Sequence, residues 1–528
     1  MLSSIVVGLL AVAAFAHEIQ ERAILQPLDH FSGPNSTTPL FLQRYFVDNQ
    51  YYHPGGPILI YSVGERTAQA SDLSDGWIGE LAKETGSLAV LLEQRFYGDS
   101  IPDVTPLDNA NGADVWQYLS VEQMMADIKR FVEQVNRMVP DWIAPPRRHG
   151  RHKTPIVLVG GSFAGSLMVW TKQRYPDLKS FVIASGAPLR VVDGYWEFDK
   201  MTAGRLPCAR ALSETVQAID EILDQGDAMQ IAALKRLFGL EHVESATDFV
   251  AALVIQVSSL MQAPVGLQSK ESIARYCSEF GQPSLESAVG IEALARMTRE
   301  YGQSHHIVPA SECLETSDDL AWLWQQCTEL GMWQTAPLQN STIADESAWF
   351  LRRLRSHRLS VNYYERQCDK CLPTIRNSRQ VAQQKEQFRI FAQRTLDSFN
   401  QLQVPSDVLL TAGELDPWLH LTAMWNMRHL ASNVLLIGGA SHAEDLIGTA
   451  EDDNINPEVL GARKKAIEAV EQWSSTRKQS VGHGRRAGRK DGGHRLLVIG
   501  SWGFQIGAAL AILCALMVKC AFIERSIA

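Results

Sequence analysis

The stretch from residue 154 to residue 170 constrains the fold of this chain more than any other. It opens with an apolar, β-type run, passes through two glycines to Ser162, and continues as an apolar run with helical spacing. A side chain at the tip of a strand-to-helix turn needs strained backbone and small neighbours, which Ala164 and Gly165 help to supply. The pattern predicts an exposed, nucleophilic Ser162. The competing interpretation is a plain turn that ends a strand.

A nucleophilic serine also needs hydrogen-bond donors for the negative charge that develops on the attacked carbonyl oxygen. The N–H of Phe163, at the start of the predicted helix, is the first candidate. We expect the second donor from an amide near Gly64, in the loop after the strand-like run 58–61. Glu65 in the same loop is a candidate for contact with a substrate amine, and its alternative role is to cap the turn.

A serine hydroxyl is a weak nucleophile near neutral pH, so it needs a histidine base that a carboxylate orients. Asp416 follows the strand-like run 408–411, and His442 follows the run 434–437. Loops that leave parallel strands meet at one edge of the sheet. The order therefore predicts the triad Ser162, Asp416 and His442. The competing residues are the carboxylates Glu414 and Asp445 and the histidines His420 and His429.

Six strand-like runs alternate with helical patterns, at residues 58–61, 88–92, 156–159, 181–184, 408–411 and 434–437. This alternation is typical of a doubly wound sheet. Together with the order of serine, aspartate and histidine, it predicts an α/β-hydrolase fold.

The spacing between these runs predicts an interrupted core. Residues 17–191 form its first part and residues 389–477 its second. Between them, residues 192–388 show long helical runs with few strand signals, which indicates an inserted, mostly helical cap domain. Such a cap over the catalytic edge would admit only chain ends or short peptides to the site, which favours an exopeptidase.

Both ends of the chain carry targeting patterns. Residues 1–16 are apolar and end in Ala-Phe-Ala, which predicts a signal peptide cleaved before His17. Residues 478–495 are polar and rich in glycine and arginine, as in a flexible linker. Residues 496–518 carry no charge over a length that can cross a bilayer, so we expect a transmembrane segment. A removable lipid-anchor signal is the alternative.

A secretory route also explains the cysteines. Six of the eight lie between the serine and aspartate motifs, which predicts disulfides within the insertion in an oxidising compartment. Their pairing cannot be read from the spacing, and disulfides are favoured over a metal or redox site at Cys368 and Cys371. The sequons at Asn35 and Asn340 are candidate glycosylation sites. The predicted location is extracellular, vacuolar or lysosomal, or membrane-anchored with a luminal catalytic domain.

Composition bounds the partners. A net charge of −10 without a basic globular face argues against nucleic acid. Triad chemistry requires neither a metal nor an organic cofactor. Peptides are the expected substrates, and a homodimer is left open.

The motifs together resemble the proline-preferring serine peptidases, a family that includes lysosomal Pro-X carboxypeptidase, dipeptidyl peptidase II, thymus-specific serine protease and secreted fungal prolyl peptidases. The similar segments are residues 26–31, 56–61, 93–100, 160–165, 324–331, 413–418 and 440–442. The resemblance implies that Ser162, Asp416 and His442 form the triad, and it favours a secreted, fungal-type member. It also implies activity in an acidic compartment.

We therefore predict a serine peptidase, exopeptidase in character, that cleaves after proline or a small residue through an acyl-enzyme. Candidates for a wall against the proline ring are Trp322, Trp324, Trp333 and Trp349. The alternatives are an esterase or lipase on the same fold, and a non-catalytic, membrane-tethered binding ectodomain. The sequence does not decide whether substrates are bound by their amino end, by their carboxyl end or internally.

Overall fold

The computed structural model describes residues 18–33, 37–102, 115–138, 154–263, 267–280, 287–304, 313, 317–337, 354–372, 379–402, 404–423, 432–449 and 455–487. The chain divides into two units, Met1–Arg477 and Lys478–Ala528, and the elements below belong to the first, apart from the last residues of helix α14. The predicted signal peptide, the predicted transmembrane segment and the sequons at Asn35 and Asn340 lie outside the described residues.

An eight-stranded sheet forms the centre of the first unit, in the order β1-β2-β4-β3-β5-β6-β9-β10. Its strands are β1 (Gln20–Pro27), β2 (Leu40–Asp48), β3 (Ile58–Ser62), β4 (Leu88–Leu92), β5 (Ile156–Gly161), β6 (Ser180–Ser185), β9 (Val408–Gly413) and β10 (Val434–Ile437). The strands from β4 to β10 pair in parallel, while β1–β2 and β2–β4 are antiparallel. This mostly parallel sheet confirms the predicted α/β-hydrolase fold.

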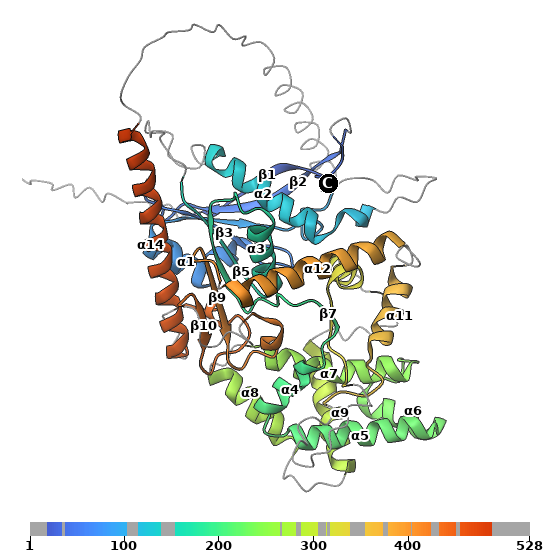
Figure 1. The fold of residues 1–528 in the computed structure, drawn as a ribbon. Helices are drawn as coiled ribbons and strands as arrows, with labels where there is room; N and C mark the ends of the chain where they lie inside the picture. The colour runs from blue at the N-terminus through green and yellow to red at the C-terminus, as the bar shows by residue number, and fades with distance from the viewer. Residues whose placement is uncertain are drawn as a thin grey trace, which may run out of the picture. The chain divides into compact units, whose positions relative to one another are not determined.

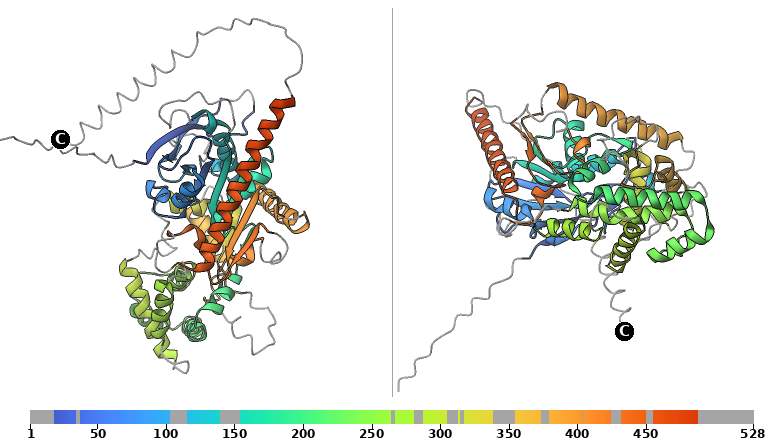
Figure 2. Two further views of the ribbon diagram at one scale, coloured as in Figure 1. Left: turned by 90° about the vertical axis from the view of Figure 1, so that its left-hand side faces the viewer. Right: turned by 90° about the horizontal axis from the view of Figure 1, so that it is seen from below.

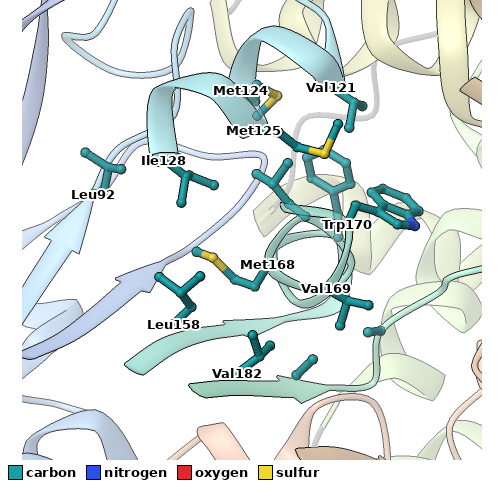
Figure 3. Packing of buried hydrophobic residues seen from close by; sticks show 14 of the residues in the cluster. Leu92, Val121, Met124, Met125, Ile128, Leu158, Met168, Val169, Trp170 and Val182 are labelled. Carbon is teal, nitrogen blue, oxygen red and sulfur yellow. The ribbon is translucent and has the colours of Figure 1, made fainter. Parts of the chain in front are cut away.

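Alternate residues of the buried strands face two different helical layers, because successive side chains of a strand point to opposite faces. In β5, Ile156 and Leu158 join one core cluster, and Val157 and Val159 join the other. One face is covered by α2 (Val121–Met138), α3 (Ser162–Arg174) and α12 (Arg379–Leu402), and the other by α1 (Trp77–Thr85) and α14 (Pro457–Ala487) (Figure 1). Figure 3 shows Met168 of α3 above Leu158 of β5, with Ile128 of α2 beyond it.

The chain between β6 and β9 is mostly helical. Its first helices are α4 (Glu197–Arg205), α5 (Ala209–Gln225), α6 (Ala228–Phe238), α7 (Ala246–Gln262), α8 (Leu267–Ser278) and α9 (Ser287–Ser304). Side chains from α5, α6, α7, α8 and α9 bury one another in a core of their own, around residues such as Phe238 and Phe249. Figure 2 shows these green helices grouped together at one end of the sheet.

The rest of this region packs differently. It comprises α10 (Ser317–Gln325), the π-helix η4 (Gln326–Leu330), α11 (Val361–Cys371) and the two-stranded sheet of β7 (Val192–Gly194) and β8 (Gly331–Trp333). Trp324 of α10 and Phe388 of α12 belong to the core of the main sheet. The predicted cap limit at residue 388 therefore falls inside a helix that packs on the sheet. Short 3-10 helices complete the described elements: η1 (Ala70–Leu73), η2 (Val115–Tyr118), η7 (Leu419–Leu421) and η8 (Glu444–Leu446).

All six cysteines between the serine and aspartate motifs form disulfides, as predicted. The pairs, which the sequence did not reveal, are Cys208–Cys277, Cys313–Cys371 and Cys327–Cys368. Cys368 and Cys371 each bond a different partner, so they do not form a metal or redox pair with each other. The first disulfide joins the start of α5 to α8, and the third joins η4 to α11.

Candidate active site

Ser162 lies where β5 ends and α3 begins, with a backbone φ of +52°. A left-handed conformation is uncommon for a residue with a Cβ and is retained only where the surroundings hold it. Gly160 permits the turn, because a Cβ there would lie 2.5 Å from the Ala164 carbonyl carbon. The strand can thus enter the helix abruptly and leave the serine at the sheet edge.

The structure brings the three predicted triad residues together. His442 Nε2 lies 2.8 Å from Ser162 Oγ. His442 Nδ1 lies 2.9 Å from each carboxylate oxygen of Asp416. The register explains the convergence: Gly161 of β5 is level with Ser185 of β6, and the loops of all three residues leave the same edge.

The surroundings favour an ion-like interaction between the histidine and the aspartate. Asp416 is fully buried, and one of its oxygens also accepts the Trp418 N–H at 2.7 Å. Burial acts to lower the pKa of His442, but the charge and hydrogen bond of Asp416, with smaller contributions from Glu65 and Asp445, outweigh it and raise that pKa. The carboxylate therefore stabilises the protonated imidazole, as a base in acyl transfer requires.

The competing residues that the structure describes have other hydrogen-bond partners or positions. Asp445 is buried and accepts hydrogen bonds from Ser185 Oγ and Thr411 Oγ1, the latter at 2.6 Å. Glu414 is exposed and accepts the Gly439 N–H at 3.2 Å. His420 lies in η7, and His429 falls outside the described residues.

The loop after β3 lies against the start of α3. Gly64 has a φ of +80°, and a Cβ at this position would lie 3.3 Å from Ala164 Cβ. The Gly64 N–H donates to Ser62 Oγ at 3.2 Å, so this amide is already engaged within its own loop. Phe163 is the second residue of α3, where helical N–H groups have no carbonyl partner inside the helix.

Glu65, the next residue of that loop, lines a cavity together with Ser162 and Phe163. Burial raises the pKa of its carboxyl group, and the neighbouring Arg66 and His442 only partly offset this effect. Arg66 itself donates to Asp72 at 3.1 Å. Glu65 thus lines the same cavity as the serine, while the neighbouring Arg66 is paired with Asp72.

The cavity has a volume of 510 Å³. The sheet edge contributes Ser162 and Trp418, and helices α7, α10 and α11 contribute most of the rest. Its aromatic lining includes Trp322, whose ring centroid lies 5.4 Å from that of Phe163, and Trp333, which stacks on Tyr364 at 4.8 Å. Trp324 is instead buried in the sheet core, and Trp349 lies outside the described residues.

Some residues that hold the site were missed by sequence reasoning. Tyr195 donates through its hydroxyl to the Pro417 carbonyl at 2.7 Å, and Trp418 Nε1 donates to Gln262 Oε1 at 2.7 Å. Arg205 donates to the Leu415 carbonyl at 2.8 Å. All three bonds link the helical region to the Asp416 loop across long sequence separations. No local pattern signals such contacts.

Within the described ranges, no three or more His, Cys, Asp and Glu side chains cluster in a way that could hold a metal ion. None of the helices in the same ranges is both long and apolar enough to cross a membrane. The predicted segment 496–518 is not among them.

A mostly parallel sheet whose strand ends join a serine, a histidine and an aspartate by hydrogen bonds defines the class of protein, a serine hydrolase with the α/β-hydrolase fold. The family model described as serine carboxypeptidase S28 matches residues 26–466, and the chain belongs to that family of serine peptidases. The resemblance seen in the sequence motifs is confirmed.

Several proteins are similar over most of the chain. Serine protease vicPa of Bipolaris victoriae is 26% identical, covering 85% of this chain and 88% of that protein. Thymus-specific serine protease of Mus musculus is 26% identical, over 86% of this chain and 87% of that protein. A protein of Arthroderma benhamiae named "Probable extracellular serine carboxypeptidase" is 29% identical, covering 61% and 50%. Among solved structures, a proline iminopeptidase of Mycobacterium smegmatis covers 86% of this chain and 99% of its own, at 12% identity and a TM-score of only 0.32.

Proposed function

We propose that Ser162, His442 and Asp416 are the triad with which this serine peptidase cleaves peptide bonds through an acyl-enzyme. Ser162 Oγ attacks the scissile carbonyl carbon while His442 Nε2 takes the serine proton and then gives it to the leaving amine. Water, activated by the same histidine, hydrolyses the ester. The observation that carries this proposal is the continuous chain of hydrogen bonds, 2.8 Å and 2.9 Å long, at the cavity wall.

The oxyanion of the tetrahedral intermediate would bind the Phe163 N–H at the start of α3. A second donor is proposed in the turn around Gly64. The Gly64 N–H can serve only if it leaves Ser62 Oγ, to which it donates at 3.2 Å. The close approach of Gly64 to Ala164 keeps this turn next to the serine in either case.

The residue on the acyl side of the cut is proposed to be proline or a small residue. The apolar, aromatic surface beside Ser162, formed by Phe163, Trp322 and Met332, supports this, because a compact ring or short side chain can pack against it. These three side chains offer no charged partner to a charged substrate side chain in that position.

We propose that the enzyme acts from the amino end of its substrates. The cavity lining includes the carboxylates of Glu65 and Asp248. Its one described cation, Arg355, is committed to Asp199 through bonds of 2.7 Å and 2.9 Å and to the Gln334 carbonyl at 2.6 Å. Asp248 already accepts the Tyr363 hydroxyl at 2.9 Å, so among the described lining residues Glu65 is the proposed partner of a substrate ammonium group, whereas a free carboxylate finds no unpaired cation there. The helical region that encloses the cavity supports an exopeptidase.

The secretory pathway is the proposed location. Three disulfides support an oxidising compartment, and one similar protein carries "extracellular" in its name. Whether the protein is released, vacuolar or lysosomal, or held at a membrane through residues 496–518 follows from fractionation of cells that express the full chain.

The test is to incubate the purified protein with peptides that contain one internal proline and to locate each cut by mass spectrometry. Ser162→Ala is the control. Cleavage after proline that disappears in this variant is expected, and equal cleavage by the variant would refute the triad. A panel of acyl esters run in parallel identifies an esterase if esters alone are hydrolysed. A folded protein that cleaves neither and resists fluorophosphonate labelling would be a binding ectodomain.

The polarity is tested with the same peptides bearing a free or an acetylated amino end. We expect acetylation to reduce kcat/KM strongly, and Glu65→Gln to reduce kcat/KM for the free amine about 10- to 100-fold while barely affecting the acetylated peptide. Release of single residues from the carboxyl end, unaffected by acetylation, would overturn this part of the proposal.

A further inference from the structure

Arg205 is the last residue of α4, yet its guanidinium reaches the backbone beside two of the proposed catalytic residues. Its Nη1 donates to the Leu415 carbonyl at 2.8 Å, to Ser441 Oγ at 3.0 Å and to the Met261 carbonyl at 2.6 Å. Leu415 directly precedes Asp416, and Ser441 directly precedes His442. One side chain of the helical region thus binds both catalytic loops.

The two loops that Arg205 joins already touch each other. The Leu415 N–H donates to the Ala440 carbonyl at 2.9 Å, and a Cβ on Gly413 would lie 2.3 Å from the Ala440 oxygen. Ser441 is fully buried, and its Oγ also donates to the Met261 carbonyl at 3.0 Å. A shift of either loop is therefore transmitted to the other and to the end of α7.

The helical region also holds the Asp416 loop at adjacent points, through Tyr195 to the Pro417 carbonyl and through Gln262 to the Trp418 ring nitrogen. The disulfide Cys208–Cys277 lies three residues beyond Arg205 and fixes this corner to α8. Of the two catalytic loops, Tyr195 and Gln262 bind only the Asp416 loop in the described part of the chain. Arg205 differs from them because it binds both Leu415, before Asp416, and Ser441, before His442.

The position of this arginine is not explained by stability alone. Its second terminal nitrogen, Nη2, is buried and makes no hydrogen bond within the described part of the chain, which is unfavourable for a charged group. Nearby Glu444 and Asp416 compensate only in part for the burial, which lowers the pKa of Arg205. An arginine guanidinium stays protonated even when burial lowers its pKa, so Arg205 supplies a cation beside the Asp416 loop.

We infer that Arg205 is a positioning residue that fixes the Asp416 and His442 loops relative to each other. Because Arg205 lies on α4, the alignment of the two loops then depends on how the helical region packs against them. This inference rests on the triad proposed above. Arg205 is not among the described residues that line the cavity, and its hydrogen bonds go to Met261, Leu415 and Ser441, so its effect would pass through the aspartate and the histidine.

The test compares Arg205→Met and Arg205→Lys in the full-length protein. Arg210→Met is the matched control, because Arg210 is exposed and, in the described part of the chain, pairs with Glu214 on the same helix, α5. We expect Arg205→Met to lower kcat about 10- to 100-fold, as small misplacements of catalytic groups do, with little change in KM. The rate of fluorophosphonate labelling should fall in parallel, Arg205→Lys should recover part of both, and Arg210→Met should match the wild type.

The pH profile separates positioning from simple loss of charge. The carboxylates that act on His442 are Asp416, Glu65 and Asp445, and Arg205 is the nearby cation. If Arg205→Met loosens the Asp416–His442 pair, the pKa of His442 falls and the acid limb of kcat moves to lower pH. If only a positive charge is lost, that limb moves to higher pH, which would overturn the inference, as would an unchanged kcat.

Ser441→Ala covers the case in which Arg205→Met does not fold. This smaller change removes the hydroxyl that links Arg205 to the His442 loop, and we expect it to lower kcat several-fold with the same direction of pH shift. Full activity of Ser441→Ala would then count against the inference. Loss of activity in Ser162→Ala together with full activity in the Arg205 variants would refute the positioning role alone, while activity in Ser162→Ala would refute the proposed triad itself.

Discussion

Asp445 accepts a hydrogen bond from Thr411 Oγ1 at 2.6 Å, which ties the turn that carries His442 to strand β9. Ser185 Oγ, at the end of β6, donates to the other oxygen of the same carboxylate. The carboxyl group is almost completely buried, and burial raises its pKa. It joins three segments at the base of the site without contacting the serine nucleophile.

Replacing Asp445 by alanine should weaken both the fold and the site. The two hydroxyls would lose a buried acceptor, at a cost of about 1–3 kcal/mol in the free energy of unfolding. Urea denaturation and kcat measured on the same preparation give the result. Asp445→Asn keeps the shape and one acceptor oxygen, so its free energy of unfolding and its kcat should lie between those of the wild type and Asp445→Ala. A denaturation midpoint for Asp445→Ala equal to that of the wild type would contradict the structural role.

The pH dependence of kcat/KM should show an acid limb set by His442. Only the neutral imidazole can take the serine proton, and the pKa of His442 is raised, against its burial, chiefly by Asp416. Activity should therefore fall with decreasing pH from a midpoint above the ordinary value of about 6.5. A pH–rate profile with a non-ionisable substrate measures it. A midpoint below the ordinary value, the direction that the acidic-compartment expectation would favour, would count against the Asp416–His442 pairing seen here.

Asp416→Asn tests the same pair from the other side. The amide cannot stabilise the protonated imidazole, so kcat should fall about 10³- to 10⁴-fold. The residual acid limb should move to lower pH. Circular dichroism and thermal denaturation should show a folded protein, because the substitution preserves the shape of a buried side chain.

Gly64→Ala should impair catalysis more than stability. The left-handed backbone at this glycine costs an alanine about 1–2 kcal/mol, and the new Cβ would press on Ala164, next to the proposed oxyanion donor Phe163. We expect a fall in kcat of about tenfold or more with KM largely kept. Gly33→Ala is the matched control, since a Cβ there meets nothing within 4 Å.

Removal of the Cys208–Cys277 disulfide should reduce both stability and activity. The bond closes a separation of 69 residues and lies beside Arg205. A double serine variant should lose about 2–5 kcal/mol of stability and some kcat, whereas a reductant should leave this variant's melting temperature less affected than that of the wild type. Equal activity of both proteins at a temperature where both are folded would show that the disulfide does not support the catalytic loops.

The strands could be predicted where the sequence forms a continuous apolar run, and all of these strands except β10 are almost wholly buried. The runs 88–92 and 434–437 coincide with β4 and β10, and the runs at β3, β5, β6 and β9 differ from the strands by one or two residues. Continuous apolar composition is the signal of such strands. Strands β1 and β2, at the antiparallel end of the sheet, were not among the predicted runs, because exposed and buried residues alternate along much of them and polar side chains dilute the pattern.

The residues of the site likewise divide into those that local sequence patterns predict and those that they do not. Ser162, Asp416 and His442 could be found because each follows a strand in the order that one fold requires. Arg205 could not be found, because its partners in the two catalytic loops lie 210 and 236 residues away and the contacts depend on how the helical region folds back. The engagement of the Gly64 N–H by Ser62 Oγ is likewise a matter of side-chain rotamer, which loop composition does not encode.

The long separation within the proposed triad has a consequence for biosynthesis. Ser162 precedes His442 by 280 residues, and β9 and β10, which lead to Asp416 and His442, form the far edge of the sheet. Domains tend to fold as the chain emerges, with the amino-terminal part first. A nascent chain therefore displays its nucleophile long before it has a base, and it cannot digest itself or its neighbours until the last strands have been translated and docked.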